Sequence, residues 1–180
     1  MWVEIVRVEE VNQTVVATVR KGIIKYLGPI IENSTIGPTL NMPPAAYNPD
    51  RQQYDADLIL NRLCHRIRGS HKVLALTERD LYTSSANLNF IFGLAQCPGR
   101  CAIVSVARLD PSFYRKRMNK KLLLERSVKE AVHELGHTFG LEHCPSQGCV
   151  MRFSNSVLEV DEKPASLCTE CWRKLYTRVL

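Results

Sequence analysis

Residues 133–143 read HELGHTFGLEH, and this spacing of histidines constrains the fold more than any other feature of the chain. Residues four apart share one face of a helix, so His133 and His137 can direct imidazole nitrogens at one metal ion. His143 supplies a third nitrogen if the chain turns back, which Gly140 permits because glycine adopts positive φ readily. The motif therefore predicts a helix, a sharp turn and a three-histidine metal site.

Glu134 follows the first histidine and lies about 100° around the helix from it. Its carboxylate is therefore expected beside the ion, where it can accept a proton from water that the metal activates. A catalytic zinc site has three protein ligands and one open position, which matches the three histidines. We predict that Glu134 is the general base of a catalytic zinc site, because a purely structural site has no use for it.

A second group of candidate ligands begins directly after His143 and consists of Cys144, Cys149, Cys168 and Cys171. These residues form C-x4-C and C-x2-C pairs, and four thiolates at such spacings can close a tetrahedral structural zinc site. Four unrelated thiols, or two disulfides, are the alternatives, and paired spacing in a reducing compartment disfavours both. The sequence thus predicts two Zn²⁺ ions per chain.

The compartment is predicted from what the chain lacks. No apolar run approaches the roughly 20 residues that span a bilayer. The opening residues, MWVEIVRVEE, place acids where a signal peptide needs cations and then a long apolar stretch. We expect a cytoplasmic protein with reduced thiols and no membrane partner.

Charge bears on possible partners. The chain has 24 Lys and Arg against 18 Asp and Glu, a formal charge of +6, which raises nucleic acid as a partner. The basic residues are scattered, and their densest cluster lacks the interleaved aromatic residues of a stacking platform. That cluster is Arg115, Lys116, Arg117, Lys120 and Lys121. Nucleic-acid binding is therefore disfavoured, and at 180 residues we expect one core with a small appendage and a monomer.

Hydrophobic periodicity predicts alternating strands and helices, which favours an α/β fold. Strands are expected over residues 3–8, 30–36, 73–76, 89–94 and 102–106, and helices over 12–27, 54–67 and 122–140. Residues 89–94 and 102–106 are expected to pair antiparallel across a turn. Residues 37–49 contain four prolines and are expected to form an irregular exposed loop, a candidate lid over a cleft.

Three cysteines and one histidine remain outside these motifs. Cys64 is most simply a small core residue, with a thiol that blocks the zinc as the alternative. Cys97 and Cys101 flank a Pro-Gly turn; free thiols are favoured over a local disulfide or a redox pair. His71 precedes a strand and is expected to be exposed to solvent.

The histidine motif matches the extended zinc signature of the metzincin metallopeptidases. Its continuation through Cys149-Val150-Met151 to Cys168-Thr169-Glu170-Cys171 resembles the archaemetzincins in particular. This resemblance implies a zinc-dependent peptidase that acts on peptide or protein substrates. It also implies the residue roles: catalytic zinc ligands at His133, His137 and His143, the general base at Glu134, and the Met-turn residue beneath the metal at Met151.

The same resemblance implies an architecture. A twisted mixed sheet with packed helices is expected in an upper subdomain, residues 1–140, and the third histidine, the Met-turn and the cysteine site in a lower one, residues 141–180. Some metzincins have a tyrosine ligand two residues after the Met-turn methionine, and here that position is Phe153. Residues 89–94 are the candidate cleft rim, an edge strand that pairs with substrate, with an ordinary interior strand as the alternative.

A binding module of a different class is the competing interpretation. Such a protein would hold zinc for stability and bind nucleic acid or a protein partner through the cysteine subdomain and the basic loop 115–121. Glu134 favours the enzyme over the binding module, because a purely structural metal site has no use for this carboxylate. No spare inhibitory segment is expected before His133, so access to the cleft would be limited by a loop.

Overall fold

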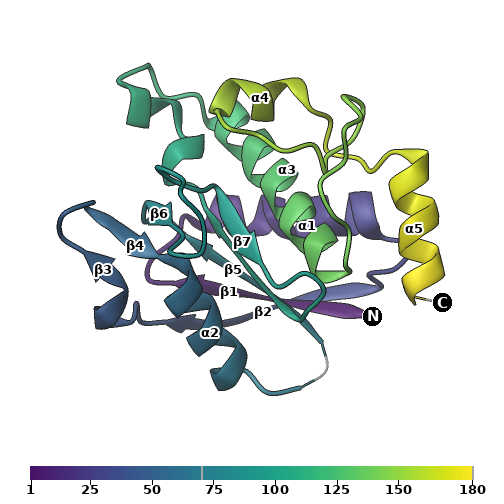
Figure 1. The fold of residues 1–180 in the computed structure, drawn as a ribbon, viewed down its shortest axis with the longest axis horizontal. Coiled ribbons are helices and arrows are strands. Elements are labelled where there is room, and N and C mark those ends of the chain that lie inside the picture. The colour runs from purple at the N-terminus through teal and green to yellow at the C-terminus, as the bar shows by residue number, and fades with distance from the viewer. Residues whose placement is uncertain (70, 180) are drawn as a thin grey trace.

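The computed structural model describes residues 1–69 and 71–179 and contains a five-stranded sheet with helices on both faces (Figure 1). The strands of this sheet are β1 (Trp2–Val8), β2 (Asn33–Leu40), β5 (Lys72–Thr77), β7 (Gly93–Ala95) and β8 (Cys101–Ser105). A smaller sheet contains β3 (Tyr47–Asn48), β4 (Gln53–Asp55) and β6 (Leu81–Tyr82). The α-helices are α1 (Gln13–Leu27), α2 (Ala56–Arg66), α3 (Lys120–Thr138), α4 (Val157–Glu162) and α5 (Thr169–Val179), with short 3₁₀ helices at Pro44–Ala46, Ala107–Leu109 and Pro111–Tyr114.

The strand order of the large sheet is β2-β1-β5-β8-β7. The first four strands are parallel, and β7 pairs antiparallel with β8, with Gly93 opposite Val104 and Ala95 opposite Ala102. The predicted α/β class and the predicted antiparallel pair are both confirmed. Because β7 is the last strand of the sheet, one side of its backbone is free of a neighbouring strand.

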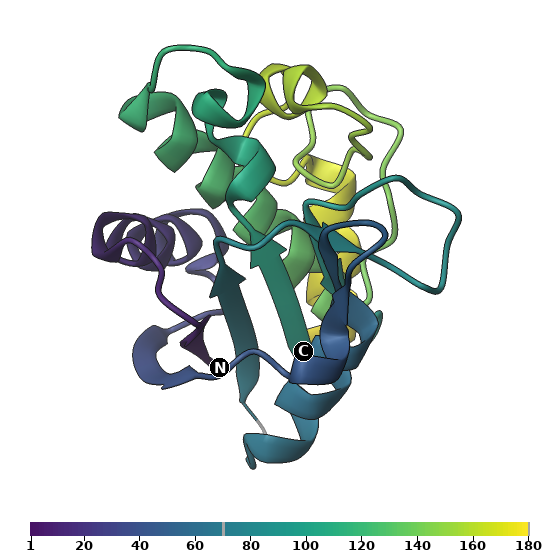
Figure 2. The same ribbon diagram turned by 90° about the vertical axis from the view of Figure 1, so that its left-hand side faces the viewer.

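Two hydrophobic clusters lie on the two faces of the sheet, because successive strand residues point to opposite sides. Leu74 and Leu76 of β5 belong to the cluster under α1 and α3, whereas Val73 and Ala75 belong to the cluster under α2. Figure 2 shows α1 and α3 on one side of the strands and α2 on the other. In the part of the chain that the structure describes, no helix is both long and apolar enough to cross a membrane.

The helix predicted from the histidine motif is α3. It begins after Asn119, whose side chain accepts a hydrogen bond from the Leu122 amide at 3.1 Å and caps the first turn. It ends where Gly140 adopts a φ of +84°, and the Leu141 amide then donates back to the Gly136 carbonyl at 3.1 Å. The predicted turn is therefore present, and it directs the following segment back along α3.

Residues 37–49 differ from the prediction of an irregular loop. Gly37 to Leu40 continue β2, Pro44–Ala46 is a 3₁₀ helix, and Met42 and Ala46 are buried in the cluster under α2. The proline at position 38 is tolerated because β2 is an edge strand and its register against β1 shifts at this point. The prediction was wrong because proline excludes only interior ladder positions, not every strand.

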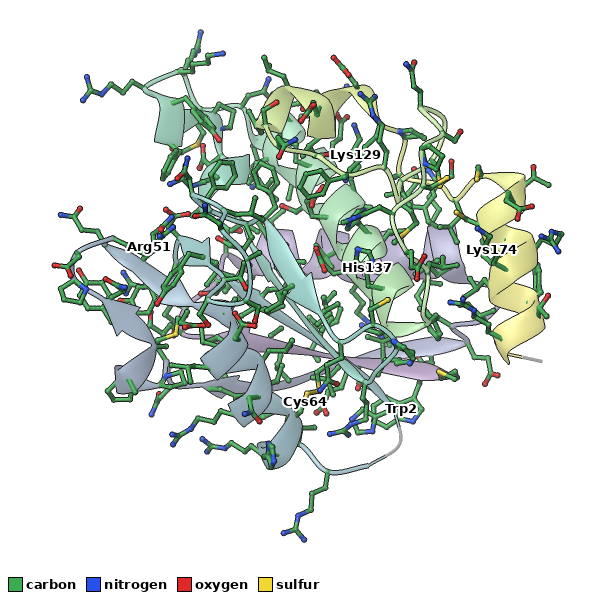
Figure 3. The ribbon with its side chains drawn as sticks, in the orientation of Figure 1. Trp2, Arg51, Cys64, Lys129, His137 and Lys174 are labelled. Atoms are coloured by element: carbon green, nitrogen blue, oxygen red, sulfur yellow. A yellow bond between two sulfur atoms is a disulfide. The ribbon has the colours of Figure 1, made fainter. Side chains whose placement is uncertain are left out.

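His71, Cys64 and Cys101 also differ from prediction. His71 is only 9% exposed; its Nε2 lies 2.9 Å from Glu4 Oε2, and its ring stacks on Trp2 with centroids 3.9 Å apart. Cys101 of β8 is not a free thiol but forms a disulfide with Cys64 of α2, at a Cα–Cα distance of 6.0 Å (Figure 3). Packing of α2 over β8 brings the two cysteines together. Cys97 is a free, exposed thiol as predicted.

Candidate active site and metal centres

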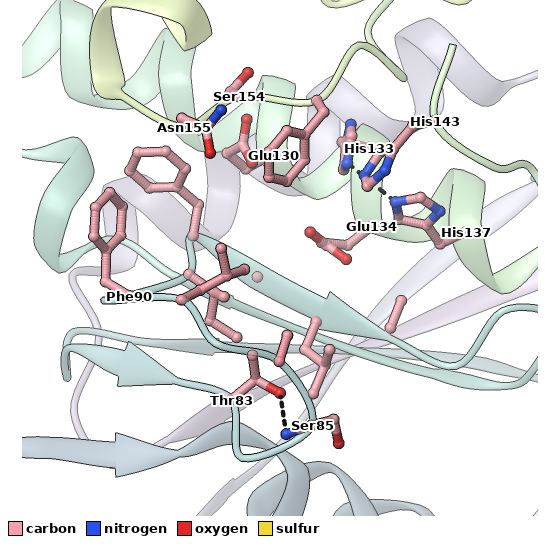
Figure 4. A pocket seen from close by; sticks show the side chains of 18 of the residues that line it. Thr83, Ser85, Phe90, Glu130, His133, Glu134, His137, His143, Ser154 and Asn155 are labelled. Carbon is pink, nitrogen blue, oxygen red and sulfur yellow. Dashed lines mark hydrogen bonds between the residues drawn. The ribbon is translucent and has the colours of Figure 1, made fainter.

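An open cleft of about 580 Å³ lies between α3 and the edge of the large sheet (Figure 4). One wall is formed by α3 and the segment that follows it, and the other by β7 and the residues before it. The first wall contributes Glu130, His133, Glu134, His137, His143, Phe153, Ser154, Asn155 and Lys163; the second contributes Thr83, residues 85–95 and Cys97.

The predicted histidines converge in this cleft. His133 Nε2 and His137 Nε2 lie 3.1 Å apart, and one ring nitrogen from each of His133, His137 and His143 lies within 4.8 Å of the others. Zinc–nitrogen distances of about 2.0–2.1 Å allow two imidazoles on one ion to approach this closely. The geometry therefore fits a three-nitrogen metal site.

Backbone carbonyls orient two of the rings. His133 Nδ1 lies 2.8 Å from the Val150 carbonyl, and His137 Nδ1 lies 2.6 Å from the Leu141 carbonyl. A carbonyl only accepts hydrogen bonds, so each Nδ1 carries the proton and each Nε2 presents a lone pair. Two facing lone pairs repel unless a cation lies between them. The hydrogen bonds from the two Nδ1 atoms to backbone carbonyls therefore support metal binding at the Nε2 atoms.

The environment keeps these histidines in the neutral form that binds metal. Burial lowers the pKa of His133 well below its usual value, and the positive charge of Lys163 lowers it further. Burial also lowers the pKa of His137 to about 4 and lowers that of His143. Protonation therefore competes weakly with a metal ion at neutral pH.

Glu134 lies beside the histidines, with its carboxylate directed toward β7 (Figure 4). The residue is 5% exposed; burial raises its pKa well above the usual value, and the carboxylate of Glu130 raises it further. A side chain at Gly93 of β7 would place its Cβ only 2.6 Å from Glu134 Oε1. Glycine at this position lets the edge strand approach the carboxylate.

Met151, predicted from the resemblance, lies under α3 and is fully buried. A Cβ at Gly136 would come within 2.4 Å of its sulfur, so the methionine packs directly on the helix between His133 and His137. Phe153, two residues later, places its ring 4.9 Å from that of His143, and it offers no hydroxyl to the cleft.

The predicted cysteine cluster also forms. Cys144 Sγ and Cys168 Sγ are 3.9 Å apart, and Cys149 Sγ and Cys171 Sγ are 3.6 Å apart. Tetrahedral coordination with Zn–S bonds of about 2.3 Å places sulfurs about 3.8 Å from one another, so these separations fit a four-thiolate zinc site. The Cys144 amide donates to the Met151 carbonyl at 3.0 Å, which connects the cysteine cluster to the floor of the histidine site.

Sequence reasoning missed Glu130 and Lys163. Lys163 Nζ lies 2.8 Å from Glu130 Oε1, and the residues are 1% and 3% exposed. The position of Glu130, one turn before His133 on the same face of α3, was a usable signal. Lys163 carried no such signal, because it reaches the cleft from a distant loop.

The opposing wall of the cleft differs in part from expectation: residues 89–94 line the cleft, but they do not form one continuous strand. β7 begins at Gly93 rather than at Asn89, and a single bridge between Leu81 and Ile91 holds the residues before it. Asp57 of α2 accepts hydrogen bonds from Thr83 and Ser85 at 2.6 and 2.7 Å, which anchors the start of this wall. Residues 37–49 do not line the cleft, so the predicted lid is wrong.

An α/β fold in which a helix presents converging histidines and a buried glutamate to an open cleft defines a metal-dependent hydrolase as the class of protein. Comparison with known proteins narrows the class. The model of peptidase family M54 matches residues 5–177. The chain is 42% identical over 167 residues to the archaemetzincin of Methanocaldococcus jannaschii, with 91% of this chain and 90% of that protein covered.

Solved structures of related proteins point to the same family. The crystal structure of the archaemetzincin from Methanopyrus kandleri matches with a TM-score of 0.84 and 41% identity, covering 99% of this chain and 94% of that one. That of a zinc-dependent peptidase from Methanocorpusculum labreanum matches with a TM-score of 0.81 and 29% identity, covering 96% and 99%. The chain therefore belongs to peptidase family M54, the archaemetzincins, and is a zinc metallopeptidase. The predicted family and metzincin-like fold are confirmed.

Proposed function

We propose that this metallopeptidase hydrolyses peptide bonds with Glu134 as the general base and with His133, His137 and His143 as the catalytic zinc ligands. The proposal rests on one observation: a buried carboxylate lies beside three converging imidazoles at the wall of an open cleft. When bound, zinc polarises the substrate carbonyl and lowers the pKa of water. The remaining steps belong to the residues of the chain.

Glu134 would accept a proton from the attacking water at a carboxylate oxygen and return it to the leaving amine. Burial raises the pKa of Glu134, which favours the protonated carboxyl group that must exist between the two steps. The free edge of β7 would pair with the backbone of an extended substrate, and Gly93 would bring that backbone close to Glu134. Pairing through main-chain groups gives affinity without strong sequence preference.

Glu134→Gln tests the general base. The change keeps nearly the same volume but removes the proton acceptor, so hydrolysis of a peptide library should fall at least ~10²-fold. Zinc content should stay unchanged, since the histidines are intact. Glu125→Gln, an exposed position on the same helix, is the matched control and should retain full activity. A Glu134→Gln protein that digests peptides as fast as the parent would remove Glu134 from the mechanism.

We propose two zinc ions per chain, the second held by Cys144, Cys149, Cys168 and Cys171. Metal analysis of the parent should give two zinc ions, with the histidine zinc exchanging faster because an open site has fewer protein ligands. His137→Ala should lose one zinc and remain folded, whereas Cys168→Ser should disturb folding. At most one zinc in metal-replete protein would contradict this count.

Several finer features of the same proposal remain predictions. A cytoplasmic location is proposed because the four cysteines of the proposed zinc site are free thiols; the disulfide between Cys64 and Cys101 corrects the expectation that every thiol outside that site is reduced. We expect the enzyme to act on peptide or protein substrates and to be a monomer. The division into an upper subdomain, residues 1–140, and a lower subdomain, residues 141–180, and the role of Met151 as the Met-turn residue are also proposed.

A further inference from the structure

A second hollow of about 720 Å³ lies between α1 and α3, away from the cleft. Its floor is apolar and includes Gly22, Leu124 and Val128. A Cβ at Gly22 would come within 2.5 Å of Val128, so glycine permits the close crossing of the two helices (Figure 1). We refer to this hollow as the α1–α3 groove.

The groove lies on the opposite side of α3 from the catalytic residues. Val128 in the groove and His137 in the cleft are nine residues apart, which is two and a half helical turns. Among residues 1–69 and 71–179, none lines both the groove and the cleft. A ligand in the groove would therefore leave the cleft open to substrate.

Lysines surround the groove. Five line it, and they are Lys21 and Lys25 of α1 and Lys120, Lys121 and Lys129 of α3. Among the lining residues that the structure describes, Glu125 alone is acidic, and its carboxylate is 3.9 Å from Lys121 Nζ. Lys129 donates to backbone carbonyls, whereas Lys21, Lys25 and Lys120 form no ion pair within residues 1–69 and 71–179. The groove therefore carries a net positive charge that the fold does not neutralise.

This charge does not serve the stability of the helices. Lys120 and Lys121 occupy the first turn of α3, which contains no acidic residue. The positive end of the helix dipole lies there and disfavours cations. Like charges on the facing helix add repulsion. An anionic ligand would relieve both effects.

We propose that the α1–α3 groove binds an acidic, amphipathic segment of a partner protein. Apolar side chains of the segment would pack on the floor at Leu124 and Val128, and its carboxylates would meet the lysines at the rim. The apolar floor favours this ligand over a nucleic acid. Tyr26 is the single aromatic residue among the described residues that line the groove, and Lys25 Nζ lies 4.9 Å from the centroid of its ring. One ring does not provide a row of stacking surfaces for bases.

Fluorescence anisotropy with a labelled synthetic helical peptide tests the proposal. The peptide carries leucines at i, i+3 and i+4 spacing and glutamates on its flanks, and binding is measured in the Glu134→Gln background so that the probe stays intact. Lys21→Glu/Lys25→Glu should weaken binding at least about tenfold. Arg62→Glu/Arg66→Glu is the matched control, because these exposed residues of α2 have the same i, i+4 spacing and the same charge change. It should bind within about twofold of the parent.

Further arms decide between ligands. A peptide with glutamine in place of glutamate should bind at least about tenfold more weakly, and added salt should weaken the binding of the acidic peptide. Equal weakening by both double variants, equal binding of the glutamine peptide, or tighter groove-dependent binding of an oligothymidylate would each overturn the proposal. If Lys21→Glu/Lys25→Glu lowers the melting temperature, Lys21→Gln/Lys25→Gln is used in its place, and it should also weaken peptide binding.

Hydrolysis of short peptides by the groove variant, measured with Glu134 present, should be unchanged. The test of the groove is therefore independent of the catalytic proposal.

Discussion

Lys163 brings a positive charge into the wall of the cleft although the residue is only 1% exposed. Its ammonium group is 2.8 Å from the Glu130 carboxylate and 3.4 Å from the Arg152 carbonyl, just after Met151. These contacts connect α3, the segment after Met151 and the loop before the last two cysteines. A buried charge without a partner is strongly unfavourable, so each member of the pair depends on the other.

Lys163→Met should therefore destabilise the fold by about 3–5 kcal/mol, because it leaves Glu130 charged and buried. Glu130→Gln/Lys163→Met removes both charges and should recover part of the loss. Urea unfolding of the zinc-loaded proteins provides the measurement. Arg173→Met breaks an ion pair on the surface of α5 and should leave the unfolding midpoint unchanged. A double variant less stable than Lys163→Met would contradict the pairing argument.

At the scale of elements, α3 performs three tasks with different faces and ends. One face presents His133, Glu134 and His137 to the cleft, and the opposite face packs against α1 through the contact between Gly22 and Val128. Its last turns rest on Met151, where no side chain larger than hydrogen fits at position 136. The helix is therefore placed by close contacts on both sides of the histidines.

Gly136→Ala tests the contact with Met151. Alanine has the higher helix propensity by about 1 kcal/mol, but its Cβ would meet the buried sulfur of Met151 at 2.4 Å. Overpacking of this kind costs roughly 1–3 kcal/mol, so we expect a net loss of stability and weaker zinc retention at the histidines. Gly148→Ala is the control, since its nearest neighbour is 3.8 Å away. Stabilisation by Gly136→Ala would show that the propensity gain outweighs the contact.

At the scale of the whole molecule, the cleft depends on both faces of the sheet. α3 supplies the histidine wall from one face, and α2, on the other, anchors the opposing wall through Asp57. The disulfide between Cys64 and Cys101 joins α2 to β8, the strand that pairs with β7. The position of the edge strand is thus linked to helices on both sides.

Cys64→Ala should lower the free energy of unfolding by about 2–4 kcal/mol, because the disulfide closes a loop of 37 residues in the unfolded chain. Peptidase activity at a temperature below the transition should persist, since neither cysteine lines the cleft. Cys97→Ala removes an exposed free thiol and should leave stability unchanged. Denaturant unfolding of both variants in zinc-containing buffer checks the difference. Equal stability of Cys64→Ala and the parent would contradict a stabilising role for the disulfide.

The local patterns of the sequence determined the features that depend on short separations. The histidine spacing and Gly140 predicted α3, its turn and the convergence of three imidazoles, because helix periodicity relates residues four apart directly to one face. The four cysteines were found in the same way, from two close pairs. Alternating apolar segments were sufficient for the α/β class and for the antiparallel pair at the sheet edge.

Only the tertiary structure decided the features that join distant segments. Glu130 and Lys163 are 33 positions apart, and Cys64 and Cys101 are 37 apart. Their pairing follows from how α2, α3 and the later loop pack on the sheet. The burial of His71 against Glu4 and the position of Thr83 and residues 85–88 in the cleft wall have the same origin. Local propensity acts through neighbouring backbone groups, whereas these contacts arise from the burial of two helix faces against one sheet, which no short window of sequence contains.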